Sequence, residues 1–372
     1  MKHRKIIISG GGTGGHIFPA ISIANAIKEI EPQAEILFVG AEGKMEMERV
    51  PAAGYPIKGL PVAGLQRKFT LSNFALPFKI LKSLNKAKRI IKNFSPDIAI
   101  GVGGYASAPL LWSATNKGIP CLIQEQNSYA GLANKILGKR VDRICTAYNG
   151  MERFFPKDKI ILTGNPIRKN IKPASKEDRE LGIKEFDLDP QKKTVFVVGG
   201  SLGSATLNKV MKKWILENST KADYQIIWQS GKFYKSDITA FLKEHNSDKI
   251  KNYEFISNMD LAYAAADIII SRAGAGTISE LCVAGKATIF VPSPNVTEDH
   301  QTHNAQALVS ANAAKMVKDL DAQNTLIGEI ESLLNNEEEI KKLETNILKL
   351  AKPTAAKDIA KEALQLIEKN GK

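Results

Sequence analysis

Short apolar runs alternate along the chain with longer segments in which apolar residues recur at the spacing of an α-helix. The runs predict two series of strands. The first series is Lys5–Ser9, Ile36–Val39, Ile98–Gly101, Pro120–Gln124, Arg143–Thr146 and Lys159–Thr163, and the second is Thr194–Val198, Tyr224–Gln229, Tyr253–Ile256, Ile268–Ser271 and Ala287–Val291. Because strands that alternate with helices form parallel sheets, the pattern predicts an α/β protein.

A polar, charge-rich stretch at residues 169–193 separates the two series and follows Gly164-Asn165-Pro166. The chain has 372 residues, which is long enough for two hydrophobic cores. We therefore expect two doubly wound domains that face each other, with a linker near Asn165. Ligands are expected in the cleft, at the carboxyl ends of the strands. The segment Glu329–Lys369 is predicted to be helical and charged.

The first strand runs into a glycine loop with the sequence Gly10-Gly11-Gly12-Thr13-Gly14-Gly15-His16. A strand, a glycine loop and a helix start present backbone N–H groups and a positive helix end to an anion. The spacing also fits the dinucleotide fingerprint, but its acidic residue is expected at the end of the second strand, and Glu42 comes late, in a loop. A phosphate site needs no histidine, whereas a proton-transfer site can use His16.

A second strand end with small residues, Ser271-Arg272-Ala273-Gly274, leads into a helix start whose N–H groups suit a diphosphate. Glu280 lies one turn into this helix. Its carboxylate either accepts both hydroxyls of a ribose or is a helix-start acid stabilised by the dipole.

Two sequence patterns resemble metal sites without the expected context. Asp187-Leu188-Asp189 and Asp319-Leu320-Asp321 do not follow a long apolar strand, so we interpret them as loop acids. Residues 298–304 contain His300 and His303, whose spacing is awkward for one metal ion, and we predict a hydrogen-bonding loop there. The sequence therefore predicts no metal ion and requires no other cofactor.

The formal net charge of +13 is compatible with nucleic acid, an anionic membrane or an anionic substrate. Residues 67–92 contain eight Lys or Arg and no acidic residue. A basic face beside an apolar stripe is typical of helices that settle on anionic lipid, although an ordinary surface helix with a core-facing stripe gives the same pattern. The basic face comprises Lys79, Lys82, Lys86 and Arg89, and the stripe comprises Phe74, Phe78 and Leu81.

Nucleic acid is not expected, because no recognised binding module is present. No apolar run approaches the ~18 residues of a membrane span. Three widely spaced cysteines are typical of a reduced, cytoplasmic protein.

Six motifs occur in a fixed order: Gly11-Gly12-Thr13-Gly14-Gly15-His16, Gly103-Gly104-Tyr105, Glu125-Gln126-Asn127, Gly164-Asn165-Pro166-Ile167-Arg168, Gly199-Gly200-Ser201 and Ser279-Glu280. In this order they resemble the MurG family of peptidoglycan N-acetylglucosaminyltransferases, within glycosyltransferase family 28. The resemblance covers nearly the whole chain, up to about Asn304. It implies the GT-B fold, in which two Rossmann-like domains enclose a cleft. Residues 1–165, joined by a helix at about 352–372, would face the acceptor and the membrane, and residues 166–351 would bind the donor.

The resemblance implies an inverting transfer of N-acetylglucosamine from UDP-GlcNAc to the lipid-linked muramoyl-pentapeptide, lipid I, which gives lipid II. It also implies a peripheral position on the cytoplasmic face of the cell membrane and partners among cell-wall synthesis and division proteins. A related transferase with another lipid or a small aglycone as acceptor, or a non-catalytic subunit that binds nucleotide sugars, is the alternative.

The family's binding residues carry over onto both domains. Thr13, Gly14 and Gly15 would face the sugar and the acceptor. The expected donor contacts are Asn127, Arg168, Ser201, the backbone of Ile256, the segment Ala275, Gly276, Thr277, Ile278, Ser279 and Glu280 with Glu280 on the ribose, and Gln301 on the sugar hydroxyls. Gly276 stands where the family leads us to expect a larger apolar residue such as leucine.

The acceptor hydroxyl needs a base, and two residues beside the first-domain loops are candidates. His16 sits at a helix start, where the positive end of the dipole favours the neutral ring. Glu125 is the alternative base, or part of a loop that orients the acceptor. We favour His16.

Overall fold

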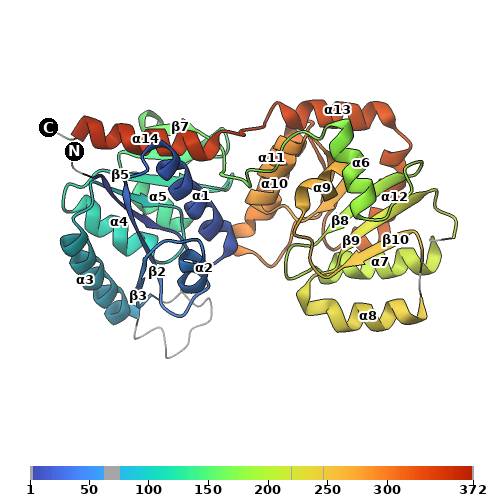
Figure 1. Cartoon of the computed structure of the whole chain (residues 1–372), viewed down its shortest axis with the longest axis horizontal. Helices are drawn as coiled ribbons and strands as arrows, with labels where there is room; N and C mark the ends of the chain where they lie inside the picture. The colour runs from blue at the N-terminus through green and yellow to red at the C-terminus, as the bar shows by residue number, and fades with distance from the viewer. Residues whose placement is uncertain (1–2, 63–75, 219, 246, 371–372) are drawn as a thin grey trace. The chain divides into compact units, whose positions relative to one another are not determined.

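The computed structural model describes residues 3–62, 76–218, 220–245 and 247–370 (Figure 1). The chain divides into two compact units. Unit 1 consists of Met1–Ile167 and Thr354–Lys372, and unit 2 of Arg168–Pro353. Each unit contains one parallel sheet with helices on it, which confirms the predicted α/β class. The sequence prediction puts the boundary at residue 165, and the contacts divide the chain after Ile167.

Unit 1 has a seven-stranded sheet in the order β3-β2-β1-β4-β5-β6-β7, with all neighbouring strands parallel. The strands are β1 (Lys5–Ser9), β2 (Glu35–Ala41), β3 (Ile57–Leu60), β4 (Ile98–Gly101), β5 (Cys121–Glu125), β6 (Arg143–Thr146) and β7 (Ile160–Leu162). The apolar run of β1 is fully buried because helices cover both faces. Ile6 and Ile8 pack on one face of the sheet and Ile7 on the other.

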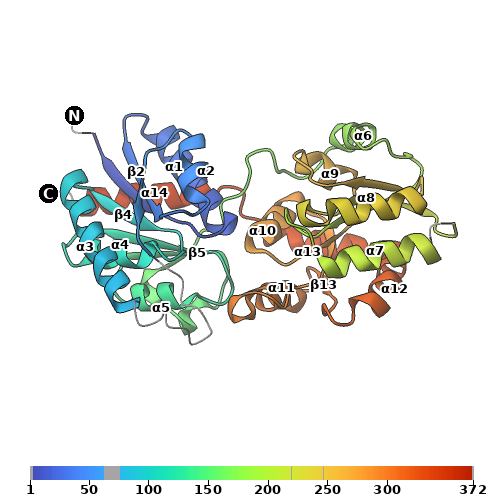
Figure 2. The same cartoon turned by 90° about the horizontal axis from the view of Figure 1, so that it is seen from below.

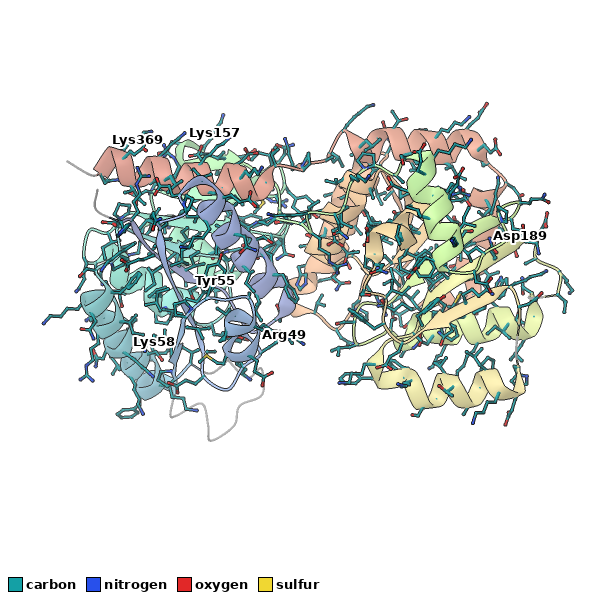
Figure 3. All side chains as sticks on the ribbon, in the orientation of Figure 1. Arg49, Tyr55, Lys58, Lys157, Asp189 and Lys369 are labelled. Atoms are coloured by element: carbon teal, nitrogen blue, oxygen red, sulfur yellow. The ribbon has the colours of Figure 1, made fainter. Side chains whose placement is uncertain are left out.

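The helices of unit 1 cover the sheet in two layers (Figure 2). Apolar residues of α1 and α14 pack with Ile6 and Ile8, and those of α3, α4 and α5 pack with Ile7. The helices are α1 (Gly14–Ile30), α2 (Glu46–Ala52), α3 (Leu76–Phe94), α4 (Ser107–Thr115), α5 (Leu132–Gly138) and α14 (Ala355–Asn370). Tyr55, labelled in Figure 3, packs against the core cluster that contains Ile6 and Ile8, and its hydroxyl donates to Asn25.

Helix α14 follows all of unit 2 in the sequence and lies beside α1 in unit 1 (Figure 1). Ile359 and Ala363 of α14 are fully buried in the same cluster as Ile23 and Ile27 of α1. Unit 1 is therefore assembled from two separate stretches of the chain.

Unit 2 has a six-stranded parallel sheet in the order β10-β9-β8-β11-β12-β13. The strands are β8 (Lys193–Val198), β9 (Tyr224–Gln229), β10 (Ile250–Tyr253), β11 (Ile268–Ser271), β12 (Ala287–Phe290) and β13 (Lys315–Met316). The helices are α6 (Lys176–Glu185), α7 (Ala205–Glu217), α8 (Lys235–Glu244), α9 (Met259–Ala265), α10 (Ala275–Ala284), α11 (His300–Ser310), α12 (Ala322–Leu334) and α13 (Glu337–Leu348). Trp214 and Trp228 lie fully buried in its core.

Two local predictions are wrong, and one helix was not predicted. The strand predicted at Tyr253–Ile256 is β10, which ends at Tyr253 because its partner β9 ends at Gln229. The charge-rich stretch at residues 169–193, for which no element was predicted, contains α6, whose first turn is closed by a capping box between Ser175 and Asp178. The loop predicted at residues 298–304 is largely the start of α11.

Short 3-10 turns complete the described chain: η2 (Met151–Arg153), η3 (Lys157–Lys159), η4 (Lys232–Tyr234) and η5 (Thr297–Asp299). Within the ranges that the structure describes, no helix combines the length and the apolar character that crossing a bilayer requires.

Candidate functional site

The first glycine loop joins β1 to α1 and holds the imidazole of His16 against its own backbone. Gly12 has a φ of +84°, which favours glycine, and Thr13 is the extended N-cap of α1. His16 Nδ1 lies 3.1 Å from the carbonyl oxygen of Gly11 and 3.3 Å from Thr13 Oγ1. A carbonyl oxygen only accepts, so Nδ1 carries the proton, and in the neutral ring Nε2 holds the lone pair that a base needs.

The loop after β4 packs directly against this first loop. Gly103 and Gly104 both have positive φ, +96° and +87°. A Cβ at Gly103 would lie 2.6 Å from His16 Cδ2, and a Cβ at Gly104 would overlap the backbone of Gly11. Only glycine allows this approach, so the two glycine motifs fix the position of the His16 ring together.

Glu46 of α2 was not among the predicted site residues. Its fully buried side chain accepts hydrogen bonds from the backbone N–H of Gly12 at 3.0 Å and of Ala41 at 2.9 Å. The first glycine loop is therefore held by a carboxylate of the protein itself. No local pattern marks Glu46, because its partners lie on two other segments.

Glu125 ends β5 and is buried among donors. Its Oε1 accepts from the backbone N–H of Asn127 at 3.1 Å, and its Oε2 accepts from Gly131 N at 3.2 Å and from Asn134 Nδ2 at 2.8 Å. Burial raises the pKa of the Glu125 carboxyl, and the hydrogen bonds from Asn134, Asn127 and Gly131 oppose that rise. These contacts fix the loop that carries Asn127.

In unit 2, Glu280 lies in the second turn of α10 with its side chain only 9% exposed. Its Oε1 is 3.3 Å from Nε of Arg168, and its Oε2 accepts from the hydroxyl of Tyr263 at 3.2 Å. Burial raises the pKa of the Glu280 carboxyl, and Arg168 and Tyr263 act in the opposite direction. Tyr263, fully enclosed in α9, is a second residue that the sequence prediction missed.

Among the other predicted donor residues, Asn127 lies in unit 1, just after β5, and those of unit 2 follow strands of the second sheet at its carboxyl edge. Helix α10 begins at Ala275 after an extended Gly274, so its first N–H groups face this edge. The N–H of Ile256 donates to Gln229 Oε1 at 2.9 Å, and Gln301 Oε1 accepts from Ser293 N at 2.9 Å. The carbonyl of Ser201 accepts from Lys232 N.

Arg272 ties this edge together, although the sequence analysis assigned it no role. Its guanidinium donates to the carbonyls of Val291 and Pro292, to Ser204 Oγ at 2.6 Å and to Asp319 Oδ1 at 2.5 Å. Three strand ends are thereby held at one point. Asp319, interpreted from the sequence as a loop acid, is the anion of this cluster.

The other Asp-x-Asp pattern serves a turn between α6 and β8. Asp189, labelled in Figure 3, accepts from Gln191 N, and Asp187 pairs with Lys251 at 2.5 Å.

Comparison with known families identifies both units. Residues 6–146 match the model of the glycosyltransferase family 28 N-terminal domain, and residues 194–363 match that of the family 28 C-terminal domain. The chain belongs to glycosyltransferase family 28.

Relatives within family 28 match along nearly the full length. A protein of Phocaeicola vulgatus is 56% identical over 366 residues, covering 98% of this chain and 97% of the relative. A protein of Cytophaga hutchinsonii is 53% identical over 371 residues, covering 100% of this chain and 99% of the relative. Both are named UDP-N-acetylglucosamine–N-acetylmuramyl-(pentapeptide) pyrophosphoryl-undecaprenol N-acetylglucosamine transferase.

Solved structures share the fold of this chain. The crystal structure of MurG from Acinetobacter baumannii superposes with a TM-score of 0.79 at 27% identity, covering 97% of this chain and 99% of that one. The kitacinnamycin glycosyltransferase, at 12% identity and a TM-score of 0.73, shares the fold. The GT-B fold expected from the sequence is thereby confirmed.

Gly276 departs from the larger residue expected in family 28. A Cβ at Gly276 would meet no atom within 4 Å. This position of α10 therefore lies beside open space and accommodates a Cβ without rearrangement.

The surface of α3 exposes both parts of the predicted amphipathic segment. Phe78 is 76% exposed and Leu81 58%, so these side chains are not core residues. Among the predicted cations, Lys86 pairs with Glu42 at 2.5 Å. Lys79, Lys82 and Arg89 are exposed, and Phe74 lies outside the described residues.

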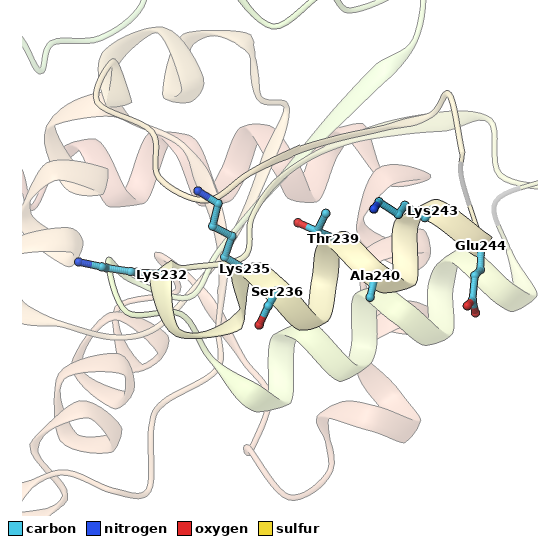
Figure 4. A pocket seen from close by; sticks show the side chains of 7 residues that line it. All are labelled: Lys232, Lys235, Ser236, Thr239, Ala240, Lys243 and Glu244. Carbon is cyan, nitrogen blue, oxygen red and sulfur yellow. The ribbon is translucent and has the colours of Figure 1, made fainter.

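A separate shallow groove runs along α8 (Figure 4). None of the predicted site residues lines it, and Lys235 at its edge pairs with Glu254 at 2.7 Å. The lining residues are Lys232, Lys235, Ser236, Thr239, Ala240, Lys243 and Glu244.

Proposed function

We propose that this chain transfers N-acetylglucosamine from UDP-GlcNAc to lipid I and releases UDP, which gives lipid II. The observation that carries the proposal is the near full-length match, at 50% identity or more, to family 28 relatives named for this reaction. The second unit supplies a helix start suited to a diphosphate and a nearly buried carboxylate beside it.

Donor binding is assigned to unit 2. The N-terminus of α10 would hold the diphosphate, and Glu280 would accept the ribose hydroxyls, each bond being worth roughly 1.5–3 kcal/mol. Arg168, half exposed beside Glu280, would offset the charge of the departing UDP. Since the N–H of Ile256 is committed to Gln229, uracil would meet the Ile256 carbonyl.

Proton transfer is assigned to His16. The acceptor hydroxyl would attack the anomeric carbon as the bond to UDP breaks, and its proton would pass to Nε2 of His16. The Nδ1 contact with Gly11 supports this role, because it keeps the lone pair on Nε2. Glu125, whose two oxygens are engaged with loop donors, fits the role of a loop organiser.

Membrane docking is assigned to α3. Its exposed Phe78, Ile80 and Leu81, next to Lys79 and Lys82, match a surface that inserts apolar side chains while cations meet anionic headgroups. A lipid-linked acceptor requires such a contact. The chain would then act peripherally on the cytoplasmic face of the membrane, where cell-wall synthesis and division proteins are its expected partners.

The experiment is a radiolabelled sugar-transfer assay with the purified chain, UDP-GlcNAc and a panel of acceptors. We expect labelled lipid II from lipid I and little product from other polyprenyl lipids or small aglycones. Preference for another acceptor would reassign the substrate. No turnover by the pure chain would favour a non-catalytic subunit that binds nucleotide sugars.

A further inference from the structure

The carboxylate of Glu46 lies against the first glycine loop, where hydrogen bonds and close packing both fix its position. Oε2 accepts from Gly12 N at 3.0 Å and Oε1 from Ala41 N at 2.9 Å, and the residue is 0% exposed. A Cβ at Gly11 would overlap this carboxylate, and a Cβ at Gly40 would lie 2.5 Å from Glu46 Cγ. Glycines on two segments therefore make room for one side chain.

The two hydrogen bonds at Gly11 and Gly12 belong to a single peptide group. Its N–H, on Gly12, donates to Glu46. Its C=O, on Gly11, lies 3.1 Å from Nδ1 of His16 and accepts from it. Hydrogen bonds in series polarise one another, so the carboxylate makes the Gly11 carbonyl a stronger acceptor for the imidazole.

We propose that Glu46 is a positioning residue for His16, acting through the Gly11–Gly12 peptide. The carboxylate holds the peptide, and the peptide carbonyl holds the proton on Nδ1 and leaves the lone pair on Nε2. A buried carboxylate does the same by direct contact in a hydrolase triad. The catalytic part of this proposal rests on the proposed function, in which His16 is the base.

The test reads the His16 ring directly by nuclear magnetic resonance of protein labelled with 15N-histidine. The chain has five histidines, so His16→Asn assigns the signals. In the wild type near pH 8 we expect the nitrogen shifts of a neutral ring protonated at Nδ1. In Glu46→Gln the amide oxygen can accept from only one of the two N–H groups, and its NH2 faces the other.

We expect Glu46→Gln to shift the His16 signals toward a mixture of tautomers. Its kcat should fall about tenfold or more, while KM for UDP-GlcNAc changes less than about twofold, because unit 2 binds the donor. Glu46→Asp, which keeps the charge, should retain the Nδ1–H tautomer and recover part of kcat. Glu48→Gln, the same change at an exposed position of α2, is the matched control and should behave like wild type.

The positioning role of Glu46 is overturned if wild-type His16 is protonated at Nε2, or if Glu46→Gln leaves the His16 signals unchanged. A change in the His16 signals without loss of turnover would support the positioning role of Glu46 and reject His16 as the base. Failure of the positioning role and failure of the proposed base are therefore distinguishable. If Glu46→Gln does not fold, the tautomer of His16 in the wild type and in Glu46→Asp decides whether Glu46 positions His16. Protonation at Nε2 in the wild type would overturn the proposal.

Discussion

Glu280, the residue proposed to bind the ribose, is oriented by its neighbours in unit 2. The Tyr263 hydroxyl donates to Glu280 Oε2 from a fully enclosed position on α9. Arg168 approaches the other oxygen from the start of unit 2. Glu280 is therefore oriented from two sides.

Tyr263→Phe removes one of these contacts and leaves the ring packing. We expect the Kd for UDP-GlcNAc to rise about tenfold, since a hydrogen bond to a charged group is worth about 1.5–3 kcal/mol. Titration calorimetry measures it. Tyr224→Phe also deletes a buried hydroxyl, which contacts Trp214 and not Glu280, and should bind the donor normally. Equal affinities in both variants would contradict the orienting role.

His16→Ala removes the proposed base. Turnover should fall about 10²–10⁴-fold while donor affinity stays within about twofold, because general base catalysis contributes this much and the proposed donor site lies in unit 2. Steady-state transfer assays and donor calorimetry measure the two quantities. Near-normal turnover, together with a loss in Glu125→Gln, would pass the role to Glu125.

Glu125 gives a prediction for pH. Burial raises the pKa of the Glu125 carboxyl above the ordinary value of 4.5. At pH values between the ordinary and the raised pKa, the folded state therefore holds a proton that the unfolded state has released. The stability of wild type relative to Glu125→Gln should be largest below the ordinary pKa and decline as pH rises through the raised one. Urea unfolding of both proteins from about pH 4 to pH 8 measures this difference. A difference that grows with pH would contradict it.

At the scale of elements, the strands with apolar residues on both faces were the predictable ones. The bounds of β1, β4, β6, β9 and β11 match the sequence prediction, because each of these strands has consecutive apolar residues at its centre, as buried parallel strands do. β3 was missed because Lys58 and Gly59 interrupt its four residues. α6 was missed although Ser175 and Asp178 carried a capping signal.

The candidate site was predictable only where its chemistry is local in sequence. His16 and Glu280 each follow a strand and a glycine-containing loop, which is a readable pattern. Glu46 contacts Gly12, Tyr263 contacts Glu280 and Arg272 contacts Asp319 over separations of 34, 17 and 47 positions, and only the fold brings these partners together.

Helix α3 is the element whose surface makes a separate prediction. Reversing the charge of Lys79, Lys82 and Arg89 together should weaken binding to anionic vesicles at least about a hundredfold, since losing three cations worth about 1 kcal/mol each has this effect before repulsion by the new acidic groups is added. Lys86 is left unchanged because it pairs with Glu42. Vesicle co-sedimentation measures the effect, which should shrink as salt rises.

The matched control reverses three exposed lysines of unit 2: Lys209, Lys243 and Lys341. It should sediment with vesicles nearly as wild type does. If both variants lose the same amount of vesicle binding, the effect of the α3 variant is due to net charge alone. If neither variant loses vesicle binding, α3 is an ordinary surface helix.

At the scale of the molecule, each unit has its own core and should unfold with its own transition. Ile359→Ala empties a fully buried site between α14 and the unit 1 sheet and should cost about 2–5 kcal/mol. Scanning calorimetry should then show the unit 1 transition at lower temperature. Ile330→Ala, equally buried in unit 2, should move the other transition. One shared transition shifted alike by both variants would contradict this independence.

The placement of α14 also orders events during protein synthesis. The ribosome makes all of β1 to β7, and then the whole of unit 2, before it makes the helix that covers α1. Unit 2 is continuous in sequence, so it can reach its native contacts while unit 1, synthesised earlier, still lacks part of its core. The usual order, in which the N-terminal domain is finished first, is therefore reversed for this chain. Until α14 emerges, Ile23 and Ile27 lack the apolar side chains of α14 that pack with them, and a chaperone can bind this incomplete hydrophobic surface.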